Sequence, residues 1–333
     1  MKILIDAVYL NSDGGIELLD ILIESTHKNF KNLDILYLLD SRNTLFNKKI
    51  KYRVCKPTIK DRKIFYKKNI KEFDKIICLA NIPPPIKLAN KSVTILFHNS
   101  LLLEWCNSIN LINNTKNLLK RFIIYLSGNR NYNWIVQTEL MKKKLSKSVF
   151  VSRNKIRVFP FFRDIALNMK NIKNDTVTRF LYVTSNSPHK KNKILIKAFK
   201  KAKFNTDIET KLSLTINGKN ISSKNKKIIF LGKLSKDEIN KEYSNTDFLI
   251  YPSVSESFGL PLVESTFYPI KILASNSEYV NYIVKPSLTF DSNSIDSIQE
   301  TIEKVVNLNK IEDSRLIINN ELESFIKFIY SNV

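Results

Sequence analysis

Glycine, cysteine and histidine are scarce in this chain, whose 333 residues include six glycines, three cysteines and three histidines. Gly14 and Gly15 follow the first apolar run, but no G-x-G-x-x-G segment occurs, which disfavours a dinucleotide-binding site. The cysteines are odd in number and fit no zinc-binding spacing, so we expect reduced, buried thiols at Cys55, Cys78 and Cys106. With so few histidines and no D-x-D segment, a metal-dependent site is disfavoured as well.

Segments that would identify several other classes of protein are also absent. No G-x-x-x-x-G-K-[ST] loop occurs, which excludes P-loop phosphoryl transfer, and there is no G-x-S-x-G elbow of the α/β-hydrolases. No apolar run reaches about 18 residues, and the N-terminal run contains Asp6 and lacks a small-residue cleavage site. We therefore expect a cytoplasmic protein, either soluble or bound peripherally at the inner face of the cell membrane.

Basic residues outnumber acidic residues by 54 to 31, and the formal net charge is +23. Residues 1–165 carry +17 of it (30 basic, 13 acidic), and residues 166–333 carry +6 (24 basic, 18 acidic). Such a charge indicates nucleic acid, a membrane surface or an acidic substrate as partner. Only 10 of the basic residues are arginines, which make the bidentate phosphate and guanine contacts, so we expect no nucleic acid. The 44 lysines and 37 asparagines are also what an AT-rich coding bias would produce.

Short apolar runs alternate with helical patterns in both halves of the chain, which predicts parallel sheets with helices on both faces. We expect strands at 2–10, 33–39, 75–79, 93–97, 134–137, 156–158, 179–184, 212–216, 227–231, 248–251 and 270–274. The clearest helical patterns lie at 111–126, 192–203, 236–243 and 314–328.

The predicted fold class is therefore α/β, with two Rossmann-like, doubly wound domains. These domains span 1–165 and 179–312, joined by a linker at 166–178 that is polar and has no clear period. Residues 313–333 are expected to form a C-terminal helix, whose return to the first domain is left open. Small molecules bind beyond the carboxyl ends of such strands, so we expect the two domains to face a central cleft that holds the active site.

The segment at 251–265 is the strongest candidate for chemistry. It follows an expected strand, and Gly259 and Pro261 prevent one continuous helix, while Pro261 suits the start of a new one. Free amides at a helix N-terminus favour phosphate, and a diphosphate would fit there. The amides concerned are those of Ser257, Phe258, Gly259 and Leu260.

Two carboxylates flank this phosphate-binding turn. Glu256 lies in the loop and Glu264 in the first turn of the helix, so each can accept hydrogen bonds from sugar or ribose hydroxyls. The alternative is an ordinary strand-turn-helix whose acids only favour the helix dipole.

Three further candidates follow expected strands. Lys190 lies in the polar loop at 185–192, where a lysine can neutralise a diphosphate leaving group; a solvated basic loop is the alternative. The pair Gly14 and Gly15 lets a backbone approach a ligand closely, or forms a plain turn. His98 stands at the carboxyl end of the strand at 93–97 and belongs either to the cleft or to the structural core.

Taken together, the second half resembles the retaining glycosyltransferases of family four, which have the GT-B fold. Glu256 and Glu264 match the E-x7-E pattern of that family, set in Ser-Phe-Gly-Leu-Pro. The supporting matches in the second half are Phe230–Leu234, His189 and Lys190 nine residues before Phe199, Ala274–Asn276 and Phe290-Asp291. The looser matches in the first half are Asp6-Ala7 with Gly14-Gly15, Phe97-His98-Asn99 and 136–142.

The resemblance implies a hexosyltransferase that retains anomeric configuration, with a UDP- or GDP-sugar as donor and neither cofactor nor metal. Glu256, Lys190 and His98 are its implied catalytic residues: Glu256 holds hydroxyls of the donor sugar, Lys190 the diphosphate, and His98 faces the sugar. The implied donor-binding residues are Gly14 and Gly15 beside the diphosphate and acceptor, Lys190, the amides of Ser257, Phe258, Gly259 and Leu260, and Glu264 at the ribose.

One departure from the family concerns the diphosphate. Many members have Gly-Arg after the strand that matches 181–183, and that Arg shares the diphosphate with the Lys. Here Thr184 and Ser185 occupy those positions, and whether Lys191 substitutes for the Arg is left open. Ser257 also replaces the commoner Gly of the E-x7-E loop.

The basic first half is expected to serve the acceptor. Residues 48–71 contain eleven Lys and Arg interleaved with Tyr52, Ile64, Phe65, Tyr66 and Ile70, a composition that suits an anionic membrane surface, and 142–147 adds a second cluster. The corresponding hypothesis is transfer to a saccharide linked to polyprenyl diphosphate, in the synthesis of a surface polysaccharide such as O-antigen or capsule. A solvated lysine-rich face produced by codon bias is the alternative.

Two other functions remain open from the sequence. A nucleotide-sugar 2-epimerase has a similar double α/β fold, but it needs a larger set of acids and bases than three histidines indicate. A non-enzymatic membrane- or nucleic-acid-binding protein would use the basic half and leave Glu256 and Glu264 without a role.

Overall fold

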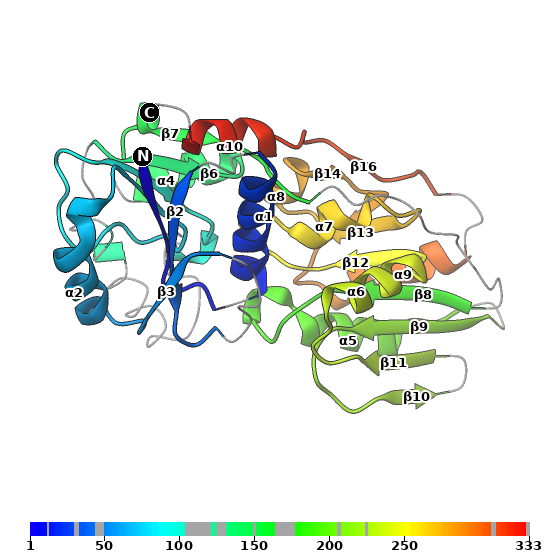
Figure 1. The fold of residues 1–333 in the computed structure, drawn as a ribbon. Coiled ribbons are helices and arrows are strands. Elements are labelled where there is room, and N and C mark those ends of the chain that lie inside the picture. The colour runs from blue at the N-terminus through cyan, green and yellow to red at the C-terminus, as the bar shows by residue number, and fades with distance from the viewer. Residues whose placement is uncertain are drawn as a thin grey trace. The chain divides into compact units, whose positions relative to one another are not determined.

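The computed structural model consists of two compact units, Met1–Arg163 together with Asn319–Val333, and Asp164–Ile318 (Figure 1). The structure describes residues 1–11, 13–29, 33–43, 50–103, 121–122, 124, 131–148, 151–163, 177–204, 208–223, 226–307 and 311–330. Each unit is an α/β fold built on its own seven-stranded sheet.

The sheet of the first unit has the strand order β3-β2-β1-β4-β5-β6-β7, and every pairing in it is parallel. Its strands are β1 (Lys2–Ala7), β2 (Asp34–Asp40), β3 (Tyr52–Cys55), β4 (Lys75–Cys78), β5 (Ser92–Leu96), β6 (Asn133–Val136) and β7 (Ile156–Val158). The helices described in this unit are α1 (Asp13–Asn29), α2 (Ile59–Asn69), α4 (Glu139–Ser148) and α10 (Leu322–Tyr330), with short 3₁₀ turns at Ile70–Glu72, Ser100–Leu102 and Arg153–Lys155.

Both faces of this sheet are buried. Along β1, Leu4 belongs to one apolar cluster, which also contains Trp134, while Ile3 and Ile5 belong to another, which contains α1 residues. Successive side chains of a strand point to opposite faces, so a strand that is apolar throughout must be covered on both sides. The uninterrupted apolar runs of the sequence therefore account for the doubly wound sheet.

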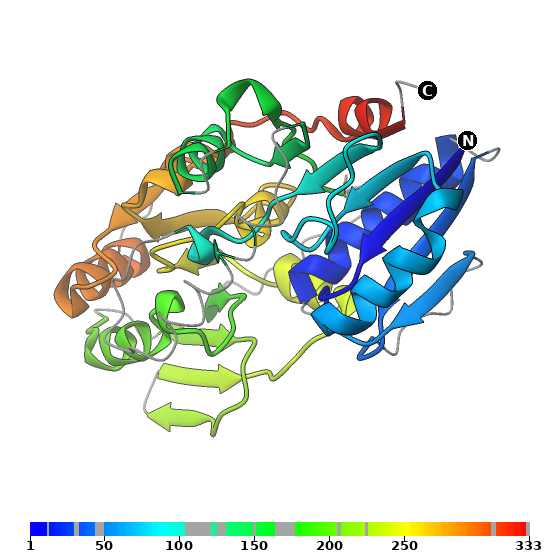
Figure 2. The ribbon, with the colours of Figure 1, turned by 90° about the vertical axis from the view of Figure 1, so that its left-hand side faces the viewer.

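The last helix, α10, packs in the first unit although it follows the second in sequence (Figure 2). Phe325 stacks on Phe161 with ring centroids 4.4 Å apart, and Ile329 is fully buried in the same cluster as α1. The hydroxyls of Tyr330 and Thr26, a residue of α1, lie 2.8 Å apart. These contacts make α10 part of the core of the first unit.

The second unit has the strand order β10-β11-β9-β8-β12-β13-β15, in which only the β10–β11 pair is antiparallel among the described residues. Its strands are β8 (Val177–Tyr182), β9 (Glu209–Leu214), β10 (Ile221–Ser223), β11 (Lys226–Phe230), β12 (Phe248–Tyr251), β13 (Lys271–Ser275) and β15 (Leu288–Phe290), with β14 (Val284–Lys285) and β16 (Arg315–Leu316) as a separate pair. The helices are α5 (Asn192–Lys201), α6 (Lys236–Ser244), α7 (Leu260–Ser265), α8 (Glu278–Asn281) and α9 (Ile295–Asn307), with a 3₁₀ turn at Pro188–Lys190.

The neighbouring strands β8 and β12 lie at the centre of this sheet and pair in parallel, with Phe248 opposite Phe180. Parallel strands end at the same edge of a sheet, so the loops that follow β8 and β12 meet there. The candidate residues Lys190 and Glu256 lie in these two loops.

Some expected elements differ from the structure. The first strand ends at Ala7, because Tyr9 has a left-handed backbone with φ of 82° that a strand cannot hold. The expected final helix at 314–328 is wrong in its first part, where β16 and a loop precede α10. Strand β8 already begins at Val177, inside the expected linker. The expected helix at 111–126 lies outside the described residues except for 121–122 and 124.

Cys55 and Cys78 are buried free thiols, while Cys106 lies outside the described residues. Within the described ranges, no helix is both long enough and apolar enough to span a bilayer.

Candidate active site

The loop between β12 and α7 carries the first of the two candidate carboxylates. Gly259, the residue before α7, has φ of 70° and ψ of 53°, a left-handed conformation that costs a residue with a side chain roughly 1–2 kcal/mol. Its carbonyl accepts from the amide of Leu262 at 2.9 Å, which closes the first turn of the helix. Pro261 is the second residue of α7, one position later than expected, where its missing N–H still costs nothing.

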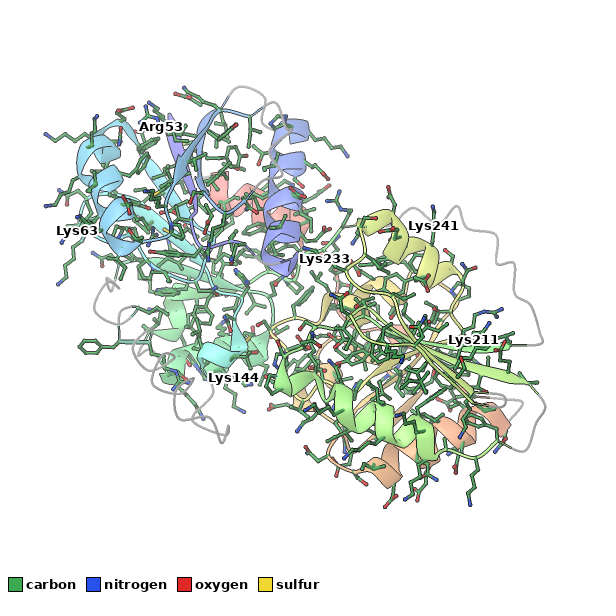
Figure 3. All side chains as sticks on the ribbon, turned by 90° about the horizontal axis from the view of Figure 1, so that it is seen from below. Arg53, Lys63, Lys144, Lys211, Lys233 and Lys241 are labelled. Carbon is green, nitrogen blue, oxygen red and sulfur yellow. The ribbon has the colours of Figure 1, made fainter. Side chains whose placement is uncertain are left out.

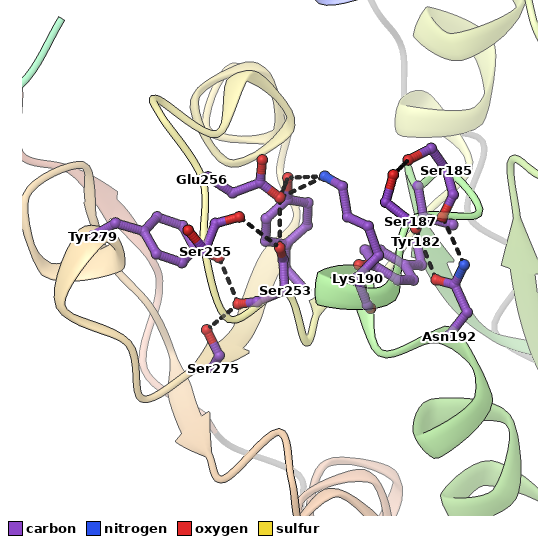
Figure 4. A network of polar contacts seen from close by, with 12 residues as sticks. Tyr182, Ser185, Ser187, Lys190, Asn192, Ser253, Ser255, Glu256, Ser275 and Tyr279 are labelled. Atoms are coloured by element: carbon purple, nitrogen blue, oxygen red, sulfur yellow. Dashed lines mark hydrogen bonds and ion pairs between the residues drawn. The ribbon is translucent and has the colours of Figure 1, made fainter. Parts of the chain in front are cut away.

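Three donors converge on one oxygen of Glu256 (Figure 4). Glu256 Oε1 lies 2.5 Å from Lys190 Nζ, 2.6 Å from Ser253 Oγ and 3.1 Å from the Tyr251 hydroxyl. The side chains of Lys190 and Glu256 are only 13% and 15% exposed. No donor from the described part of the chain is recorded at Oε2, so that oxygen retains its capacity to accept from a ligand.

Lys190 is itself held at both ends by tyrosines. The Tyr182 hydroxyl donates to the Lys190 carbonyl at 2.7 Å, and Lys190 Nζ donates to the Tyr251 hydroxyl at 3.2 Å and lies 5.2 Å from the centre of that ring. The amide of Val254 donates to the carbonyl of His189 at 3.0 Å, which ties the two loops together. A lysine that would otherwise be flexible is therefore fixed beside Glu256.

The tyrosines of this network keep their protons across the physiological range and so remain hydrogen-bond donors. Burial raises the pKa of Tyr251 well above its ordinary value, and the Glu256 carboxylate raises it further. Burial likewise raises the pKa of Tyr182. The hydroxyls of Tyr279 and Ser275 donate to the Ser253 carbonyl at 2.8 and 2.7 Å, which fixes the loop ahead of Glu256.

Glu264, the second candidate carboxylate, has a similar pair of partners. It forms an ion pair with Lys236, at the start of α6, and Oε2 accepts from the Tyr243 hydroxyl at 3.1 Å. Glu264 is 14% exposed, and burial together with this carboxylate raises the pKa of Tyr243 well above its ordinary value. The Tyr243 ring stacks on Tyr268 with centroids 5.2 Å apart. Each carboxylate thus has one lysine and one buried tyrosine.

Apart from Lys190, the sequence did not point to the partners of these acids, which are Tyr251, Ser253, Lys236 and Tyr243. One signal was available: Tyr251 and Ser253 directly precede Glu256 in the same segment. Lys236 follows Ser235, which with Glu238 forms a capping box at the start of α6, so a helix with its first lysine at this end was predictable.

The loop after β8 is a hydrogen-bonded turn at the point where many members of the family have Gly-Arg. The Thr184 hydroxyl donates to Asn192 Oδ1 at 2.8 Å, and Asn192 Nδ2 donates to the Ser185 carbonyl at 2.7 Å. Lys191 precedes α5 with φ of 55°. The substitution of Lys191 for the missing Arg, left open from the sequence, stays open.

The amides expected to bind phosphate differ in their surroundings. For the amides of Gly259 and Leu260, no acceptor is recorded among the described residues. Ser257 and Phe258 have interactions within the chain, and Phe258 is 4% exposed. In the described ranges, no group of three or more His, Cys, Asp or Glu side chains is arranged to hold a metal ion.

His98, in the first unit, follows β5 and is half-buried. Its amide donates to Asn81 Oδ1 at 2.6 Å, and Nε2 lies 2.9 Å from the Leu79 carbonyl, so Nε2 carries the proton and Nδ1 is the acceptor nitrogen. Burial lowers the pKa of His98, which favours the neutral imidazole. His98 is therefore suited to accept from a hydroxyl rather than to pair with a phosphate.

Gly14 and Gly15 lie in the first turn of α1 rather than in the expected turn before it. Gly14 is exposed, and a Cβ added there would meet no atom within 4 Å. The backbone of Gly14 is thus open to a ligand. The structure places these glycines and His98 in the first unit, and Lys190, Glu256 and Glu264 in the second.

The basic segment at 48–71 is divided by the fold. Arg62 and Tyr66, expected at a membrane surface, are instead buried in the core, where both bind the Asp6 carboxylate. The outer side of α2 carries exposed side chains, and Lys63 points away from the sheet (Figure 3). The large apolar side chains exposed in this segment are Tyr52, Val54, Ile59 and Ile64.

Solved structures with the same architecture are GT-B glycosyltransferases, and the two parallel-sheet units define that fold here. HepE from Anabaena, solved with UDP and glucose, is 13% identical and has a TM-score of 0.67, covering 92% of this chain and 90% of that chain. WaaG, a glycosyltransferase involved in lipopolysaccharide biosynthesis, is 11% identical with a TM-score of 0.68 and 100% coverage of both chains. The lipopolysaccharide outer core galactosyltransferase WaaB is 17% identical with a TM-score of 0.60, covering 92% and 90%.

The sequence itself gives one family match. Residues 165–322, which span the second unit and its candidate site, match the family model described as glycosyl transferases group 1. No curated protein gives a match to the chain. The family model thus supports a glycosyl transferase domain in the second half of the chain, and the solved structures show the GT-B fold.

Proposed function

We propose that this protein is a retaining, metal-independent glycosyltransferase that moves a hexosyl unit from a UDP- or GDP-sugar to a saccharide acceptor. The observation that carries the proposal is the buried pairing of Lys190 with Glu256 at the carboxyl ends of β8 and β12. In this proposal the cation serves a diphosphate and the carboxylate serves sugar hydroxyls, and both lie within the segment that matches the group 1 glycosyl transferases.

In this proposal the chain's residues divide the donor between them. Lys190 gives up its ion pair with Glu256, binds the diphosphate instead, and stabilises the negative charge that develops on the diphosphate as its bond to the sugar breaks. Glu256 accepts from the sugar hydroxyls through Oε2, and Glu264 accepts from the ribose hydroxyls. The amides of Gly259 and Leu260 donate to the phosphate and sugar. Lys190 and these amides supply the leaving-group stabilisation that a divalent metal supplies in other transferases.

The neutral His98 faces the donor sugar and accepts from one of its hydroxyls, while Gly14 and Gly15 let the backbone approach the diphosphate and the acceptor. The departing phosphate oxygen removes the proton of the acceptor hydroxyl on the face that the leaving group occupied. Attack on that face retains the anomeric configuration.

The related structures support the choice of donor and acceptor. HepE was solved with UDP and glucose, and WaaG and WaaB are described with lipopolysaccharide synthesis. We extend the proposal to a lipid-linked acceptor, with polyprenyl diphosphate as its carrier, in the synthesis of a surface polysaccharide.

The first experiment is a thermal-shift screen of UDP- and GDP-sugars, followed by transfer assays. A donor at 100 times its Kd stabilises the protein by about 2.7 kcal/mol.

We expect Glu264→Ala to raise the donor KM tenfold or more and Lys190→Ala to lower kcat tenfold or more, each about 1.4 kcal/mol. The exposed residues Glu300 and Lys193, changed to Ala, are the controls. Unchanged constants in both site variants would refute the site, and an epimer formed from donor alone would identify a 2-epimerase.

Attachment to anionic membrane is proposed for the outer side of α2. Lysines near such a surface contribute about 1 kcal/mol each. The exposed lysines of α2 are Lys60, Lys63, Lys67 and Lys68. Changing all four to Gln should abolish co-sedimentation with phosphatidylglycerol vesicles at low salt. The matched control changes the four exposed lysines of α5, which are Lys193, Lys197, Lys200 and Lys201. Equal binding by the two variants would count against the α2 surface.

A further inference from the structure

Tyr251 contacts both charged groups of the candidate site. It is fully buried, accepts from Lys190 Nζ at 3.2 Å and donates to Glu256 Oε1 at 3.1 Å. Ser253 Oγ, also fully buried, donates to the same oxygen at 2.6 Å. Neither residue is part of the donor-binding set that the family resemblance implies.

When Lys190 leaves Glu256, the hydroxyls of Tyr251 and Ser253 can still donate to the Glu256 carboxylate. When Lys190 turns to a diphosphate, it leaves behind a carboxylate that is only 15% exposed. A buried charge that loses its partner is costly unless other donors remain on it. Tyr251 and Ser253 both remain on Oε1, and Oε2 stays open to a ligand.

We propose that Tyr251 is a positioning residue that holds Glu256 in place while Lys190 exchanges Glu256 for the diphosphate of the donor. The lysine is the exchangeable partner of the carboxylate, and the tyrosine is the permanent one. This inference rests on the proposed function, because the exchange needs a diphosphate bound at this site.

The arrangement around Glu264 supports the same division of roles. There Lys236, which is 34% exposed, is the accessible partner, and fully buried Tyr243 is the fixed one. Two carboxylates eight positions apart, reached from different elements, thus have the same pair of partner types. A chance arrangement of structural ion pairs does not require a buried tyrosine at each.

The test compares Tyr251→Phe with Tyr330→Phe. Both changes remove one buried hydroxyl and keep the ring, but the Tyr330 hydroxyl lies in the first unit, 2.8 Å from the hydroxyl of Thr26. Three quantities are measured for each: Kd for the nucleoside diphosphate, UDP or GDP, that wild type binds; Kd for the matching nucleotide sugar; and kcat.

For Tyr251→Phe we expect the nucleoside diphosphate Kd to stay within twofold of wild type, because Lys190 and the phosphate-binding amides are intact. The nucleotide-sugar Kd should rise and kcat should fall, and the product of the two changes should be about tenfold or more, in the range for a hydrogen bond to a charged group. Tyr330→Phe should leave all three within threefold. Ser253→Ala, which removes the other donor to Oε1, should repeat the Tyr251→Phe pattern and replaces it if that variant does not fold.

Three results would overturn the inference: Tyr251→Phe behaves as wild type, Tyr330→Phe shows the same losses, or nucleoside diphosphate binding falls as much as nucleotide-sugar binding. Failure of wild type to bind any nucleotide sugar would instead refute the proposed function. The two failures are therefore distinguishable.

Discussion

Replacing Arg62 by Met should destabilise the first unit strongly. The Arg62 side chain is 3% exposed and Asp6 is 0% exposed, with Nε and Oδ2 2.8 Å apart. The guanidinium also donates to the carbonyls of Pro83 at 2.7 Å and Ile82 at 3.1 Å. Burial alone would lower the pKa of Arg62, but the Asp6 carboxylate outweighs it and raises that pKa above its ordinary value.

The expected cost follows from what Arg62→Met leaves behind. Among the described residues, Asp6 keeps the Tyr66 hydroxyl at 2.6 Å and the Val8 amide at 3.1 Å, while the buried carbonyl of Pro83 and the half-buried one of Ile82 lose a donor. Breaking such a buried pair costs about 3–5 kcal/mol. With a urea m-value of about 2 kcal/mol/M, the midpoint should fall by roughly 1.5–2.5 M.

The matched control is Lys51→Met. Lys51 pairs with Asp34 in the same unit at 3.0 Å, but both side chains are exposed, 62% and 47%, so water can replace the ammonium group and the cost should be about 1 kcal/mol or less. Both tryptophans of the chain lie in residues 1–163, so tryptophan fluorescence during urea unfolding reports on the first unit. Equal midpoint shifts in the two variants would refute the reasoning.

Two further predictions concern His98 and the glycines. Burial lowers the pKa of His98 in the folded state, so as pH falls below about 6.5 the unfolded chain binds a proton that the folded chain does not bind, and wild type loses stability. The urea midpoint of His98→Asn should therefore decline less than that of wild type from pH 7 to 5. Parallel declines in the two proteins would contradict this. Gly259→Ala should lower Tm, because an alanine at φ of 70° costs roughly 1–2 kcal/mol. Gly14→Ala should raise Tm, because the helix propensity of alanine adds up to about 1 kcal/mol of stability at an open position. The opposite order of melting temperatures would be inconsistent with these backbone conformations.

The sequence predicted the central strands well, because their side chains are apolar and buried on both faces. Strand β12 (Phe248–Tyr251) and strand β7 have the bounds that were predicted, and the others differ by a few residues. It missed the short strands β10, β14, β15 and β16. It also missed β3, the edge strand of the first sheet, because Tyr52, Arg53 and Val54 are exposed there and look like surface residues. Burial of Arg62 was equally hidden, because its partner Asp6 lies 56 positions away.

Within the second unit, the sequence predicted the two acids of the candidate site, Glu256 and Glu264, and one lysine, Lys190. A pattern of spacing identifies Glu256 and Glu264, but it does not say which cations they meet, since Lys190 and Glu256 are 66 positions apart. Tyr243 and Tyr251 read as core residues in the sequence, and their hydroxyls acquire a second role only when the fold places a carboxylate beside them. The roles assigned to the site residues, the linker, the membrane surface and the cleft between the domains stay predictions.

The return of α10 to the first unit has a consequence for how the polypeptide matures. Phe325, Ile326 and Ile329 enter a core whose strands are all encoded before residue 164, so during synthesis the first unit waits for the whole of 164–318 before it can close. The second unit emerges intact and is free to fold in the meantime. A fragment cut at Arg163 would expose the apolar surface that α10 covers, so an independently folding first unit requires residues 319–330 joined back to it.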